Sequence, residues 1–377
     1  MARTSQNNEP KDNEPKDKKK APPTPMEQMA AYLEENKKFF YNDLEEPTYV
    51  ISSGSLKLDI QMGGGLRPGV IRLTGVTEGG KTNCALSFAR NFLTTVENSY
   101  VIYFRAEGRL TDEILNRQGL LNHPRLQIVK GNVYEKVIGF IANQVKNNPH
   151  QARYLFVVDS ADAMIPIGDL DKKPEEANKV SGGALLTSDM LRRMANMFIA
   201  FGHICIIISQ KRDQVTISQY AKSDPRITNA SGGNALLHYS DWILEFQHRY
   251  FSDLILSNPE EKDSMVGHLC KIIFRKSPNE KSFTKVDYPI RYGRENGKSI
   301  WVEREIFDIL VAFAMLVKTA EKSAWLTLVE PERVLLKEAG LEFPEKIQGE
   351  STTIEFLEQN PKITDHLYKR LCANLHK

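Results

Sequence analysis

Apolar runs of strand length alternate with helical segments between Tyr49 and about Asn296. The clearest strands are predicted at Tyr100–Phe104, Tyr154–Val158, Ile204–Ile208, Trp242–Phe246 and Cys270–Phe274. Near-continuous apolar runs of this kind, separated by helices, are typical of a largely parallel sheet that is covered on both faces. The pattern therefore predicts an α/β core, which we place at residues 51–296.

The two ends of the chain differ from this core. Residues 1–25 are polar and repeat Asn-Glu-Pro-Lys-Asp, which predicts a disordered tail. A capping-box pattern at Thr24–Glu27 then precedes apolar residues spaced as on one face of a short helix. That face packs either on its own core or on a neighbouring subunit. Beyond Gly297 the pattern becomes helical, so residues 297–377 are predicted to form a small C-terminal domain.

Composition and charge limit the kinds of binding surface and cellular compartment that we expect. The 377 residues carry a net charge of +2, so any surface that binds nucleic acid must be a local patch. Four cysteines lie far apart with no C-x-x-C spacing, which favours buried free thiols over a zinc site. No apolar run approaches the length of a membrane span, and the N-terminus lacks the apolar core of a signal peptide. We therefore expect a cytoplasmic protein with no membrane partner.

One glycine-rich stretch indicates nucleotide binding. It reads Gly75-Val76-Thr77-Glu78-Gly79-Gly80-Lys81-Thr82 and matches G-x-x-x-x-G-K-[ST] in full. A predicted strand precedes it, and a predicted helix follows from Asn83, which is the context of a phosphate-binding loop. Its backbone N–H groups would hold phosphates, Lys81 would reach the β- and γ-phosphates, and Thr82 would hold Mg²⁺. The alternative is a chance glycine turn.

Three polar residues at predicted strand ends extend this site. Asp159 ends an apolar strand and is a second candidate Mg²⁺ ligand. Glu107 follows the Tyr100–Phe104 strand at the same sheet edge, where it could accept a proton from the attacking water; the alternative is a surface acid. Gln210 closes the Ile204–Ser209 strand, and its amide could sense the γ-phosphate.

A long polar loop follows Gln210. Between residues 211 and 231 it contains the cations and the aromatic residue that suit a single-stranded nucleic acid, namely Lys211, Arg212, Tyr220, Lys222 and Arg226. Cations would contact phosphates and the aromatic ring would stack on a base. The alternative is an ordinary solvated loop.

Taken in order, these segments resemble the RecA family of recombinases, including phage relatives. Besides the glycine loop, the likeness includes Ala106-Glu107, Val157-Val158-Asp159-Ser160 and Ser231-Gly232-Gly233-Asn234-Ala235-Leu236. The last of these is similar to the family's signature at the end of its second DNA-binding loop. Near the C-terminus, Phe356-Leu357-Glu358-Gln359-Asn360-Pro361 is similar to the RecA C-terminal domain.

The resemblance implies a DNA-dependent ATPase with ATP and Mg²⁺ as cofactors, which polymerises on single-stranded DNA as a helical filament and exchanges strands with duplex DNA. It implies a RecA-type core with an N-terminal helix/strand arm (residues 26–50) that joins subunits, and an α+β C-terminal domain. Glu107 would activate water, and Lys276, with Arg275 beside it, would reach a neighbour's ATP. DNA contacts would come from 167–180, with Lys172 and Lys173, and from 211–230 with Gly232, Gly233 and Asn234. Single-strand-binding and loader proteins are further expected partners.

Several positions depart from the family pattern. Arg105 and Phe274 replace an acid and a lysine, and Ser209 precedes Gln210 where asparagine is usual. Ile114 stands in place of the tyrosine that stacks on adenine, so the base preference is not predicted. Three other functions remain open: a ring helicase or loader, a phosphotransferase acting on small molecules, and an ATP-binding scaffold with little turnover.

Overall fold

The computed structural model describes residues 22–37, 40–41, 45, 47–108, 110–172, 181–210, 233–258, 260–261 and 263–375, with backbone only at 181–187, 233–235 and 374–375. The chain divides into two compact units, Met1–Glu45 and Glu46–Lys377. The first contains the helix α1 (Pro25–Glu35). Thr24 Oγ1 accepts a hydrogen bond from Glu27 N, and the Glu27 carboxylate accepts one from Thr24 N, which completes the predicted capping box. The described residues of the 26–50 arm contain this helix and no strand.

The second unit contains a mixed sheet, within the described residues, whose strands follow the order β3-β2-β4-β5-β1-β6-β8-β7, with β9 beside β8. The first six in this order are parallel: β3 (Leu126–Lys130), β2 (Ser99–Arg105), β4 (Arg153–Asp159), β5 (Ile204–Ile208), β1 (Gly69–Gly75) and β6 (Trp242–Phe246). The rest are antiparallel: β8 (Met265–Lys276), β7 (Leu254–Leu256) and β9 (Lys285–Arg291). The largely parallel α/β core is confirmed.

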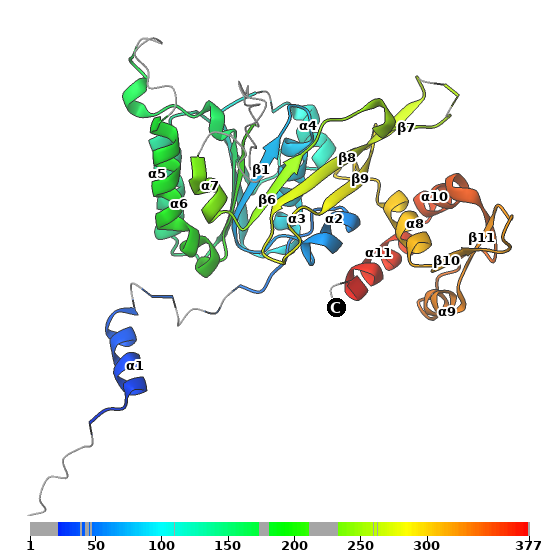
Figure 1. Cartoon of the computed structure of the whole chain (residues 1–377), viewed down its shortest axis with the longest axis horizontal. Coiled ribbons are helices and arrows are strands. Elements are labelled where there is room, and N and C mark those ends of the chain that lie inside the picture. Colours follow the sequence, from blue (N-terminus) through cyan, green and yellow to red (C-terminus); the bar gives the residue numbers. More distant parts are fainter. Residues whose placement is uncertain are drawn as a thin grey trace, which may run out of the picture. The chain divides into compact units, whose positions relative to one another are not determined.

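Helices cover both faces of this sheet (Figure 1). On one face lie α2 (Leu56–Met62), α3 (Lys81–Thr95) and α4 (Asp112–Gln118), and on the other α5 (Tyr134–Lys146), α6 (Ser181–Phe201) and α7 (Gly233–Tyr239). Strand side chains alternate between the two faces. On β1, Ile71 and Leu73 join the cluster around α3, whereas Val70 joins the cluster around α6. Burial on both faces explains the uninterrupted apolar runs in the sequence.

The C-terminal part is an α+β arrangement around a small antiparallel sheet. Its elements are α8 (Val302–Ala312), β10 (Leu316–Lys318), β11 (Trp325–Leu328), α9 (Glu330–Glu338), β12 (Ile347–Gln348), α10 (Gly349–Gln359) and α11 (Pro361–Leu375). Its apolar side chains share one cluster with Leu56 of α2. The buried Glu305 carboxylate accepts hydrogen bonds from Ser55 Oγ (2.5 Å) and Leu56 N (2.9 Å), so it caps α2. Among the described helices, none is long and apolar enough to span a membrane.

Candidate nucleotide-binding site

The glycine loop joins the end of β1 to the start of α3 at the carboxyl edge of the sheet. Gly75 has a φ of 129°, and a Cβ atom there would lie 2.1 Å from the carbonyl oxygen of Phe246 on β6. Gly80, at a φ of 105°, would place a Cβ 3.2 Å from Cys270 Sγ on β8. Only glycine fits such positions without strain. The loop therefore depends on how closely two neighbouring strands approach it.

Lys81 begins α3 and folds its side chain back over the loop. Its Nζ donates to the carbonyl oxygens of Gly75 (3.1 Å) and Val76 (2.6 Å). Burial lowers the pKa of Lys81, and the charges of Asp159 and Glu107 oppose that effect. A buried ammonium ion above the loop's backbone is the arrangement that a polyphosphate requires.

Thr82 and Asp159 lie in direct contact. Thr82 Oγ1 donates to Asp159 Oδ2 over 3.0 Å, and Tyr103 Oη donates to the same oxygen. Burial raises the pKa of Asp159, against the lowering effect of these two donors. A hydroxyl and a carboxylate beside a phosphate loop are hard oxygen ligands, and they fit Mg²⁺ held partly by a nucleotide. The structure thus brings the two predicted metal ligands together and adds Tyr103, which the sequence did not single out.

Glu107 and Gln210 also meet at this edge. Gln210 Nε2 donates to Glu107 Oε1 over 2.5 Å, and Ser160 Oγ donates to the other oxygen of Glu107. The Gln210 backbone N–H donates to Asp162 Oδ2 over 2.6 Å. Glu107 follows β2 and Gln210 follows β5, and β4 lies between these two strands, so the two side chains meet because all three parallel strands end at the same edge. Glu107, Ser160 and Gln210, together with residues 77–83, line a cleft of about 790 Å³.

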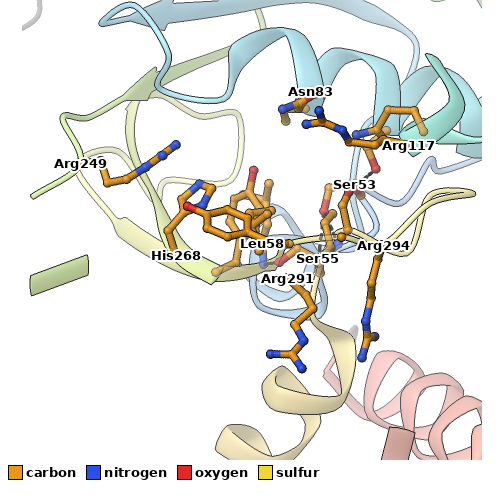
Figure 2. Close-up of a pocket in the computed structure, with 18 of the residues that line it drawn as sticks. Ser53, Ser55, Leu58, Asn83, Arg117, Arg249, His268, Arg291 and Arg294 are labelled. Carbon is orange, nitrogen blue, oxygen red and sulfur yellow. Dashed lines mark hydrogen bonds between the residues drawn. The ribbon is translucent and has the colours of Figure 1, made fainter. Parts of the chain in front are cut away.

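A second chamber, of about 430 Å³, adjoins this cleft and shares several of its lining residues, including Asn83, Arg117, Arg249 and His268. Figure 2 shows Asn83 and Arg117 on one side and His268 with Arg249 on another. Arg249 Nη2 lies 3.5 Å from the carbonyl oxygen of Glu78, so a further cation borders the glycine loop. Ile114 lines the main cleft, at the rim where α4 faces it. Sequence patterns gave no signal for Arg249 or His268, since both come from the antiparallel part of the sheet or the loop before it.

Arg275 and Lys276 are not among the residues that line either cavity. Arg275 pairs with the buried Glu245, through Nε (2.6 Å) and Nη2 (2.9 Å). Lys276 Nζ donates to the carbonyl oxygens of Leu237 (3.0 Å) and His238 (2.8 Å) at the end of α7. Both cations therefore bind groups of their own subunit away from its glycine loop.

The candidate DNA-binding residues are mostly outside the described part of the chain: Lys173, Lys211, Arg212, Tyr220, Lys222, Arg226 and Gly232. Lys172 is described; its Nζ lies 2.7 Å from Asp169 Oδ1, in an exposed ion pair. Gly233 and Asn234 form the start of α7.

Comparisons with known proteins give the relatives of this chain. Residues 40–296 match the family model of the RecA N-terminal domain. Protein RecA of Salinispora tropica is 25% identical over 339 residues, covering 87% of this chain and 84% of the relative. Protein RecA of Pseudomonas fluorescens is 26% identical over 328 residues, covering 86% and 82%. The crystal structure of the RadB recombinase matches with a TM-score of 0.45 at 19% identity, over 66% of this chain and 98% of that one.

Proposed function

The chain belongs to the RecA family, and from that premise we propose that it is an ATP-dependent recombination protein. It polymerises on single-stranded DNA, hydrolyses ATP with Mg²⁺, and pairs the bound strand with homologous duplex DNA. The observation that best supports this is the contact between Glu107 and Gln210 across the cleft beside the glycine loop. A plain nucleotide-binding loop needs no such pair, whereas an ATPase that reports its nucleotide state to a DNA loop does.

The predicted residues of the cleft have distinct roles in this proposal. Residues 75–83 hold the phosphates through backbone N–H groups, and Lys81 neutralises the β/γ charge. Thr82 and Asp159 hold Mg²⁺, which supplies charge stabilisation when bound. Glu107 orients water and accepts its proton. Gln210 changes partner when a γ-phosphate is present, and the loop that starts at residue 211 changes with it.

Two features support the proposed assembly into filaments. Within its own unit α1 has no buried residue, and its Met26, Met29 and Tyr32 are 60–74% exposed, so the described part of that unit provides no core for this apolar face. Residues 26–50 therefore dock on a second copy of the chain. Lys276 then acts at the neighbour's nucleotide, after exchanging the α7 carbonyls for phosphate oxygens. Arg275 binds Glu245 of β6 and so fixes the end of β8, where Lys276 lies.

The remaining domain and partner assignments are part of the same proposal. Residues 1–25 are a tail, 51–296 the ATPase core and 297–377 a separate domain, and DNA is contacted by 167–180 and 211–230. The protein works in the cytoplasm on the nucleoid, with single-strand-binding and loader proteins as accessory partners.

The test separates binding from turnover. Lys81→Ala should abolish ATP binding and DNA-dependent filaments together, because it removes the buried cation of the loop. Glu107→Gln should form filaments on single-stranded DNA with ATP but lose hydrolysis. Glu97→Gln, which removes an exposed acid at a distant turn, is the control. Negative-stain imaging and a phosphate-release assay supply the readouts.

The outcomes discriminate among the alternatives. Filaments that require DNA and ATP support the recombinase, whereas closed rings that form without DNA support a helicase or loader. Nucleotide binding with no turnover in the unmodified protein supports the scaffold. Wild-type hydrolysis by Glu107→Gln would show that another group activates water.

A further inference from the structure

A buried arginine lies in the middle of the central strand. Arg72 on β1 is 1% exposed, and its Nε donates to Ser209 Oγ over 3.0 Å. Burial lowers the pKa of Arg72 to about 10, and the charges of Asp162 and Glu245 counter that effect. A guanidinium in this setting has lost its water and depends on the few polar groups around it.

The sheet register explains why these groups share one space. Arg72 pairs with Ile207 of β5 and with Ile243 of β6. Side chains two positions apart lie on the same face of a sheet, so Ser209 and Glu245 are on the Arg72 face. That face is the one covered by α6 and α7, since Ile207 packs in their apolar cluster. Arg72, Ser209 and Glu245 are all buried, so this polar group is enclosed on the face of the sheet that α6 and α7 cover.

On one side this group reaches the candidate nucleotide site. Ser209 directly precedes Gln210, whose backbone N–H donates to Asp162 Oδ2 over 2.6 Å. The side chain of the same glutamine donates to Glu107 over 2.5 Å. The end of β5 is thus held by Arg72 through Ser209 and by Asp162 through Gln210.

On the other side the group reaches Arg275. Glu245, which is 1% exposed, accepts both hydrogen bonds of the Arg275 fork at 2.6 and 2.9 Å. The next residue, Lys276, is bonded to the carbonyl end of α7. Arg72 consequently lies between the γ-phosphate-sensing end of β5 and the strand end proposed to face a neighbouring subunit.

The network has hydrogen-bonding capacity that it does not use. Within the part of the chain that the structure describes, Arg72 Nη2, Asp162 Oδ1 and Thr74 Oγ1 are buried without a hydrogen-bond partner. Buried polar groups are nearly always paired, and exceptions often occur at functional sites. The Arg72 and Asp162 atoms have no partner although each residue makes another hydrogen bond, and the charges of Arg72 and Asp162 act on each other, which suits a second arrangement in which Arg72 binds Asp162 directly.

We propose that Arg72 is a positioning residue that couples the nucleotide-dependent state of Gln210 to the Glu245–Arg275 pair. The inference rests on the proposed function, because it takes Gln210 to sense nucleotide. In one state Arg72 holds Ser209 and Asp162 holds the Gln210 backbone. In the other, the end of β5 has moved and Arg72 binds Asp162, so the Glu245–Arg275 pair, which is present in both states, loses the charge of Arg72 beside it. The two states differ in which acceptor the guanidinium uses.

The experiment measures coupling rather than activity. The dissociation constant of a labelled single-stranded oligonucleotide is measured by fluorescence anisotropy with Mg-ADP and with a Mg-bound non-hydrolysable ATP analogue. Their ratio is the coupling factor, expected at about 5- to 150-fold for the unmodified protein. Arg72→Met and Ser209→Ala should keep the ADP-state affinity and lower the factor at least fivefold. Arg72→Lys should restore part of it, since lysine keeps the charge but lacks the fork.

A matched control is available at the opposite edge of the sheet. Arg125 Nη1 donates to the buried Ser99 Oγ over 3.0 Å, so Arg125→Met and Ser99→Ala remove the same kind of contact far from Gln210. Both controls should keep the coupling factor.

The results separate a failure of this inference from a failure of the proposed function. If the unmodified protein couples and both Arg72→Met and Ser209→Ala couple equally well, the inference is wrong and the proposed function stands. If the unmodified protein shows no coupling, both fail. If Arg72→Met does not fold, Ser209→Ala alone decides, because it leaves the guanidinium in place.

Discussion

Replacing Glu305 by glutamine should remove a pH dependence from the stability of this protein. The Glu305 carboxyl is fully buried and caps α2 from α8, across the junction between the core and the C-terminal part. Burial raises its pKa to about 8 from an ordinary value of 4.5, and this outweighs the lowering effect of the Ser55 and Leu56 donors. Burial likewise raises the pKa of the neighbouring Asp59, to about 7.

The sign follows from proton binding. Below pH 4.5 the Glu305 carboxyl is protonated in both the folded and the unfolded chain. Between about pH 4.5 and 8 the unfolded chain releases this proton and the folded chain keeps it, so stability falls as pH rises. Each pH unit of this window removes about 1.4 kcal/mol, and the full effect approaches about 5 kcal/mol. Asp59 adds an effect of the same sign.

Glutamine imitates the protonated acid. Its oxygen can accept from Leu56 N, and its amide can donate to Ser55 Oγ. We therefore expect Glu305→Gln to match the unmodified protein near pH 5 and to exceed its free energy of unfolding by several kcal/mol at pH 9. Urea unfolding from pH 5 to 9 is the assay. Fluorescence of the buried Trp301, which directly precedes α8, reports on this junction.

Asp308→Asn is the control on the same helix. Asp308 is partly exposed and pairs with Lys57 at 2.6 Å, so its loss should lower stability by less than about 1 kcal/mol. Parallel stability curves for Glu305→Gln and the unmodified protein across the whole pH range would refute the reasoning. They would mean that Glu305 is ionised in the folded protein.

Three further predictions concern assembly and DNA. Lys276→Ala and Lys81→Ala proteins, each inactive alone, should regain DNA-dependent ATPase activity when mixed, because some interfaces then combine an intact Lys276 with an intact glycine loop. No recovery in verified mixed filaments would contradict a nucleotide site shared between subunits. Tyr220→Ala should weaken single-strand binding by about 1–3 kcal/mol, and Arg226→Ala should lower the salt slope by about 0.7; anisotropy titrations that show no change would place DNA contact elsewhere. Tyr32→Glu should reduce self-assembly in sedimentation without changing the unfolding midpoint, since this side chain is 61% exposed.

The sequence alone determined the kind of core and predicted most residues of the candidate nucleotide site. Uninterrupted apolar runs predicted a parallel sheet, because strands buried on both faces have no polar side. The glycine loop could be recognised in the sequence because its geometry depends on eight consecutive residues. Asp159, Glu107 and Gln210 could be predicted because each lies at or just beyond the end of an apolar strand, and parallel strands bring such positions to one edge.

Tertiary structure alone decided which distant residues meet. The strand order put Gln210 on Glu107, and the sheet register placed Arg72 beside Ser209 and Glu245. The cap that Glu305 provides for α2 joins positions about 250 residues apart. No local pattern predicts these contacts. A charged residue inside an apolar run gives the same sequence pattern whether or not the fold places a hydrogen-bonding partner beside it. Only the folded chain supplies those partners, and burial then sets the pKa of each buried charged group.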